Sequence, residues 1–244
     1  MKKLTALLAL GAVVAFMPSV SKASIVGSEH DFTSETGGAG SITNQGIASF
    51  TWSGGGGTYQ NPCQVCHIPH KAQDPTVSMA PLWNHAPSAN ASSYVKYGDG
   101  PNASPTFKAL GLSVTLGSSV ACLSCHDGSV AVNEMAGYTG KVSTNGNAGA
   151  ASAIPSWAVE AIGGTDLTKM HPIGVSYTAA AAVDVDLVQT PTALMNRMLK
   201  GTQKTVECAS CHDIHRTMGV ATTYSHNLIV SLDGGALCTT CHSK

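Results

Sequence analysis

The sequence predicts a mostly irregular chain with short α-helices and little β structure, whose core is not built mainly from apolar side chains. Three observations support this prediction. Only 11% of the 244 residues are charged, against about 25% in an average soluble domain. Periodic apolar faces, which ordinary helices and strands bury, are missing over most of the length. Eight cysteines and ten histidines are present, and all eight cysteines fall into four copies of one short motif.

Residues 1–23 predict a secretory signal peptide, which leaves a single mature domain over residues 24–244. Lys2 and Lys3 precede an apolar run from Leu4 to Met17, and small residues follow it; this is the order of a cleaved signal. The run is shorter than the roughly 20 residues of a membrane-spanning helix. We therefore expect a secreted protein, extracellular or at the cell surface, with the periplasm as the alternative and no membrane insertion.

The mature chain is expected to be acidic. Removing Lys2, Lys3 and Lys22 leaves ten basic residues against 14 acidic ones. A nucleic-acid partner would need a basic face, so none is expected.

Each of the four motifs is Cys-x-x-Cys-His, the attachment pattern of c-type haem. Two thiols at this spacing can bond to the two vinyl groups of one haem, while the adjacent imidazole binds its iron. The expected thioether residues are Cys63, Cys66, Cys122, Cys125, Cys208, Cys211, Cys238 and Cys241, and the expected proximal ligands are His67, His126, His212 and His242. Disulfides, zinc sites and thioredoxin-like pairs also use cysteines, but none requires a histidine after every second cysteine.

Four covalently attached haem c groups, each with its iron, are thus the predicted cofactors. They complete the predicted fold class, a multihaem cytochrome c in which short helices pack around haem. The motif spacing divides the domain into a haem pair over residues 63–126 and a compact second pair over residues 208–242, joined by residues 127–207.

Six histidines remain for the four distal iron positions. The distal candidates are His30, His70, His85, His171 and His215, with His226 ranked last. Because the supply exceeds the demand, every iron can take two histidines, which leaves no open position for a substrate. This favours electron transfer over catalysis, and no catalytic residue is predicted.

Two of the distal candidates share a position relative to a motif. His70 stands three residues after His67, and His215 stands three residues after His212. A side chain this close to the tether of its own haem is poorly placed for the opposite face of that haem. It could reach a neighbouring iron if the haems stack, so the spacing is typical of packed haem pairs.

Few other elements can be predicted. Residues 192–201 have a proline before them and a glycine at their end, which indicates a short helix; its Met195 and Met198 are expected to pack rather than to bind iron. Residues 177–188 fit either a helix or a strand. Residues 37–57 and 142–155 are rich in Gly, Ser, Thr, Asn and Ala and are expected to be loops.

The sequence resembles the multihaem cytochromes with doubled Cys-x-x-Cys-His motifs. The resemblance is carried by the four motifs together with Cys66-His67-Ile68-Pro69-His70, Pro81-Leu82-Trp83-Asn84-His85, His171-Pro172-Ile173-Gly174 and Cys211-His212-Asp213-Ile214-His215. Within this family it looks like the tetrahaem cytochromes of the OmcE type, which polymerise into extracellular conducting filaments. The resemblance implies stacked haems and an iron that takes a histidine from the next subunit, for which His30 or His70 would be the donor.

The sequence-based hypothesis is therefore a tetrahaem electron carrier that forms a homopolymer. Its other partners would be multihaem cytochromes and terminal electron acceptors. A monomeric periplasmic electron shuttle is the alternative, and a multihaem reductase with one open iron is a third possibility.

Overall fold

A computed structural model of the chain describes residues 82–130, 162–215 and 225–243, together with Ile25, Ser28, His30, Cys63, Cys66, His67 and Val159. The predicted signal peptide, His70 and the two predicted loops lie outside the described residues. The described part includes all eight cysteines and the histidines of all four motifs.

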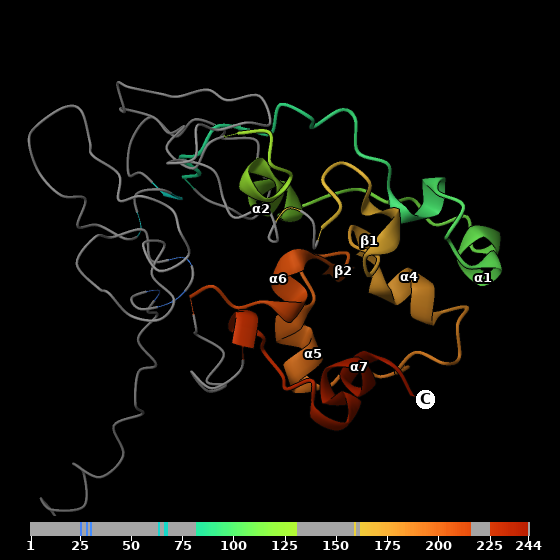
Figure 1. Cartoon of the computed structure of the whole chain (residues 1–244). Coiled ribbons are helices and arrows are strands. Elements are labelled where there is room, and N and C mark those ends of the chain that lie inside the picture. Colours follow the sequence, from blue (N-terminus) through green and yellow to red (C-terminus); the bar gives the residue numbers. More distant parts are fainter. Residues whose placement is uncertain are drawn as a thin grey trace, which may run out of the picture.

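Short helices and turns dominate the described residues (Figure 1). The α-helices are α1 (Pro105–Ala109), α2 (Ser119–His126), α4 (Tyr177–Ala181), α5 (Ala193–Met198), α6 (Cys208–Cys211) and α7 (Ala236–Cys241). The 3-10 helices are η2 (Tyr97–Asp99), η3 (Leu167–Lys169), η4 (Ser225–Asn227) and η5 (Asp233–Gly235). The strands are β1 (Val175–Ser176) and β2 (Thr205–Val206), which pair antiparallel with Val175 opposite Val206.

Local sequence explains where several helices begin. The Thr192 hydroxyl accepts a hydrogen bond from the Met195 amide at 3.2 Å and caps α5. The Ser104 hydroxyl likewise accepts from the Phe107 amide at 3.0 Å and caps α1, whose first residue is a proline. Such side-chain caps satisfy amides that have no partner within the helix. The helix expected over 192–201 is thus α5, whereas residues 177–188 form α4 over their first five residues and then a turn.

Among the described residues, the buried apolar side chains form small separate clusters. In the described part of the chain, one cluster joins α4 to α5 through Tyr177 and Met195, a second surrounds Leu123, and a third contains Trp83. Each cluster packs against one motif cysteine: Cys241, Cys208 and Cys66, respectively. The clusters are therefore arranged around the motifs.

Candidate functional site

Three of the four motifs coincide with a helix: the second ends α2, the third forms α6, and the fourth ends α7. In the first, third and fourth motifs, the backbone amide of the histidine donates to the carbonyl of the first cysteine: His67 to Cys63 at 2.8 Å, His212 to Cys208 at 3.0 Å and His242 to Cys238 at 2.9 Å. The second motif, Cys122 to His126, lies within the longer helix α2. The turn brings both cysteines and the histidine of a motif to one short element.

None of the eight cysteines forms a disulfide. Burial raises the pKa of the Cys66 and Cys125 thiols to about 12, and that of Cys211 to about 11. Among the described residues, no group of three or more His, Cys, Asp or Glu converges as structural zinc ligands do.

Motif cysteines of neighbouring segments also lie close together. The Cys122 and Cys208 thiols are hydrogen-bonded to each other, which raises the pKa of Cys122 and lowers that of Cys208. The second and third motifs therefore meet at their first cysteines, where α2 packs against α6 (Figure 1).

Three motif histidines each face a different distal candidate. The ring centroids of His126 and His30 are 6.0 Å apart, those of His67 and His215 are 6.0 Å apart, and those of His242 and His171 are 6.3 Å apart. The planes of the rings meet at 41°, 30° and 76° in the same order. No histidine is used twice in these pairs, although members of each pair are far apart in the sequence.

This separation fits two imidazoles on opposite sides of one metal ion. A nitrogen–metal distance of about 2 Å on each side, with the ring radius added, places the two centroids about 6 Å apart. Aromatic contacts also occur at this distance, so the distance alone does not identify the site. His67 also lies 6.0 Å from Trp83. Each of the three pairs joins one histidine expected as a proximal ligand to one expected as a distal ligand. The residues present therefore fit a haem with two histidine ligands.

Hydrogen bonds orient one paired ring, His171, and the ring of the motif histidine outside the three pairs, His212. His171 Nδ1 donates to the carbonyl of Pro172 at 3.0 Å, and His212 Nδ1 donates to the carbonyl of His226 at 2.8 Å. Because a carbonyl only accepts, Nδ1 carries the proton and Nε2 is left to bind a metal. Metal-binding histidines commonly donate their second nitrogen in this way. Partial burial and the neighbouring His242 lower the pKa of His171, which favours the neutral, metal-binding form.

The structure places the other distal candidates differently. His85 is buried against the second motif, with Nδ1 at 2.9 Å from the Ala86 carbonyl and Nε2 at 3.4 Å from Cys125 Sγ. His226 contributes its backbone carbonyl to His212. His30, expected as a possible donor to another subunit, faces His126 of its own chain. His70 lies outside the described residues.

Sequence reasoning missed two buried carboxylates beside the motifs. Asp127 accepts hydrogen bonds from the Tyr94 hydroxyl at 2.7 Å and the Ser129 amide at 2.8 Å. Glu207 accepts from Ser119 in α2 and from the Gly117 amide. The available signal was position: Asp127 directly follows the second motif, and Glu207 directly precedes the third.

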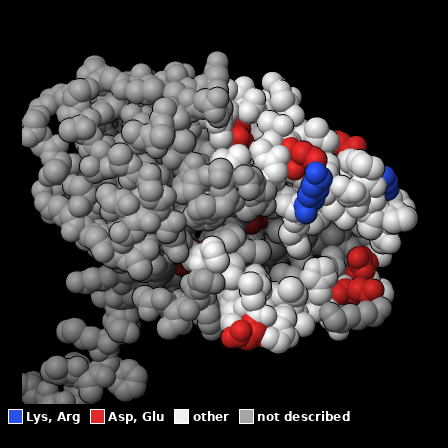
Figure 2. Space-filling model, viewed as in Figure 1, with Lys and Arg blue, Asp and Glu red and all other residues white. Residues whose placement is uncertain are grey.

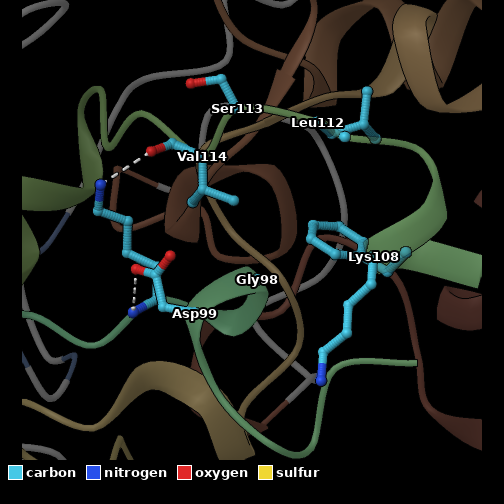
Figure 3. Close-up of a pocket in the computed structure, with 9 residues that line it drawn as sticks. Gly98, Asp99, Lys108, Leu112, Ser113 and Val114 are labelled. Atoms are coloured by element: carbon cyan, nitrogen blue, oxygen red, sulfur yellow. Dashed lines mark hydrogen bonds between the residues drawn. The ribbon is translucent and has the colours of Figure 1, made fainter. Parts of the chain in front are cut away.

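A pocket of about 400 Å³ opens near α1, away from the motifs (Figure 3). Its lining contains neither cysteine nor histidine. The Lys96 ammonium donates to the Val114 carbonyl at 3.1 Å across it, so its charge is already hydrogen-bonded. The pocket is separate from the histidine pairs.

Comparisons with protein-family models, with curated proteins and with solved structures found no match. In the described ranges, every helix is too short or too polar to cross a membrane.

Proposed function

We propose that this chain is a tetrahaem c-type cytochrome that transfers electrons. The observation that carries the proposal is the set of three histidine pairs, each combining a motif histidine with a separate distal histidine. When bound, each haem would supply a one-electron iron couple. The motif cysteines would anchor it, and the paired imidazoles would occupy both axial positions of the iron. Filled axial positions suit electron transfer and leave no site for substrate.

The fourth iron would be held by His212, and we propose His70 as its second ligand. The pair formed by His67 and His215 crosses between the first and third motifs. His70 follows His67 by three residues as His215 follows His212. The iron at the first motif would then be held by His67 and His215, and the iron at the third motif by His212 and His70. Each of these two irons would take one histidine from the other motif segment.

We further propose that copies of the chain associate into a filament. Only 11% of the residues are charged, which lowers the repulsion between copies, although acidic groups outnumber basic ones on the described part of the face in Figure 2. Exposed apolar side chains flank the fourth motif: Val185, 82% exposed, lies in a turn bonded to Ser243, and Leu232 precedes α7. Electron microscopy of the secreted protein should show filaments; only single molecules at high concentration would favour the periplasmic shuttle.

Axial ligation is tested by His171→Ala in the full chain matured with haem. The variant should keep four covalent haems, because its thioether cysteines are intact. One haem of the four should change from low spin to high spin in electron paramagnetic resonance, because it has lost its second imidazole.

The matched control is His226→Asn. His226 gives His212 only a backbone carbonyl, and asparagine tolerates its positive φ of 61°, so all four haems should stay low spin. A wild-type protein without covalent haem would refute the proposed function. A His171→Ala spectrum identical to wild type would refute the assigned ligand pair.

A further inference from the structure

Glu207 is a buried charge at the junction of two motif segments. The side chain is 1% exposed, and it precedes Cys208, the first cysteine of the third motif. Its carboxylate reaches across to the residues that begin α2, the helix carrying the second motif. One carboxylate is thereby shared between segments separated by 88 residues in the sequence.

Every polar partner of this carboxylate among the described residues is a hydrogen-bond donor. The Gly117 and Ser119 amides each donate at 3.1 Å, and the Ser119 hydroxyl donates to the same carboxylate. This set suits an ionised carboxylate, which only accepts, better than a carboxylic acid, which must also donate. No Lys or Arg pairs with Glu207 in the described part of the chain, and the groups that face its carboxylate there are the hydrogen-bond dipoles of Gly117 and Ser119.

The packing at this point is close and specific. A Cβ added at Gly117 would lie 2.7 Å from Glu207 Oε1, so only glycine leaves room for the carboxylate. The Ser119 hydroxyl also accepts from the Cys208 amide at 2.9 Å. Together with the contact between the Cys122 and Cys208 thiols, these bonds fix Glu207 between the second and third motifs.

We propose that Glu207 sets the reduction potentials at the second and third motifs by holding them low. The inference rests on the proposed function, since it concerns haems attached at those motifs. One-electron reduction of a ferric c-type haem removes one unit of positive charge, and a nearby negative charge favours the oxidised form. Burial leaves this interaction weakly screened by solvent.

A purely structural role is the competing explanation, because Glu207 also caps the start of α2. Glu207→Gln separates the two. Glutamine has a side chain of the same length and one acceptor oxygen, but it carries no charge. If Glu207 acts only as a cap, the substitution should change the stability of the protein and leave the reduction potentials unchanged. Asp99→Asn is the matched control, because Asp99 is an exposed carboxylate in the pocket away from the motifs.

The haem-loaded full chain is titrated with a chemical reductant while its absorption spectrum and the solution potential are recorded. The titration curve is fitted to four one-electron steps. In Glu207→Gln, the reduction potentials of two of the four steps should rise by at least about 59 mV, which corresponds to a tenfold change in the ratio of oxidised to reduced haem at a fixed potential. The other two steps, and all four in Asp99→Asn, should stay in place. A Glu207→Gln titration that overlays the wild type overturns the inference.

A second variant covers the case in which Glu207→Gln does not fold. Ser119→Ala keeps the charge but removes a hydroxyl that donates to it, so the same two steps should move downward, opposite to Glu207→Gln. No movement or an upward movement overturns the inference. Thermal unfolding of each variant gives a separate readout of the cap. A wild type with no covalent haem would overturn the proposed function as well, whereas four haems with unmoved potentials would overturn only this inference.

Discussion

Replacing Gly174 with alanine should destabilise the junction between the segments that lead into α2 and α6. The Gly174 amide donates to the Val206 carbonyl at 2.7 Å, and its carbonyl accepts from the Thr115 amide at 2.9 Å. Its φ of +74° costs a residue with a Cβ about 1 kcal/mol. An added Cβ would also lie 2.7 Å from the Thr115 oxygen, and such overpacking costs about 1–3 kcal/mol. The expected total loss in the free energy of unfolding is about 2–4 kcal/mol.

The control is Gly111→Ala, which isolates the backbone contribution. Gly111 has a φ of +56°, and an added Cβ would meet no atom within 4 Å, so only about 1 kcal/mol should be lost. Urea unfolding of the haem-loaded protein, followed by circular dichroism, measures both variants against the wild type. Equal losses in the two variants would show that the contact with Thr115 relaxes freely, and the packing argument would be refuted.

Three further substitutions test the packing around α4 and α5. Tyr177→Phe removes a hydroxyl that lies 3.0 Å from the Val188 carbonyl and 2.8 Å from the Cys241 carbonyl, and should cost about 1–2 kcal/mol in urea unfolding. Burial raises the pKa of Tyr177 above its ordinary value of 10.0, so its contribution is present below pH 10 and lost as the pH rises further; the variant should lack this alkaline loss. Met195→Ala, at a fully buried position, should cost about 2–5 kcal/mol; a smaller loss would mean that the cluster collapses into the space. Thr192→Ala removes the cap of α5 and should lower the thermal midpoint by the equivalent of about 1 kcal/mol, with an unchanged midpoint counting against the cap.

Local features of the fold could be predicted from the sequence because their causes are local. Pro191, Thr192 and Gly201 delimit α5 within a few residues, and in three of the motifs the histidine amide closes a turn onto the carbonyl of the first cysteine. The extent of α4 could not be predicted from the local sequence. The residues that follow it form a turn, and this turn is held by a distant residue: the Ser243 amide donates to the Asp186 carbonyl.

The pairing of the histidines could be predicted only as a count. Six candidates for four positions indicate that two histidines per iron are available, but nothing local says that His30 faces His126 rather than another ring. The role of Glu207 was hidden for the same reason: its partners in α2 stand 88 residues away. Both features are contacts between residues far apart in the sequence. The chain has few periodic apolar faces from which such contacts could be predicted.

The three histidine pairs interlock along the chain. His67 lies between His30 and His126, while His171 lies between His67 and His215, so each pair encloses one member of the next. No cut of the chain between His30 and His242 leaves all three pairs whole. During synthesis from the N-terminus, the first pair can close once His126 has emerged, the crossed pair must wait for His215, and the last needs the final residues. Late, nonlocal closure of this kind slows folding, and the third pair cannot form before His242 has been made.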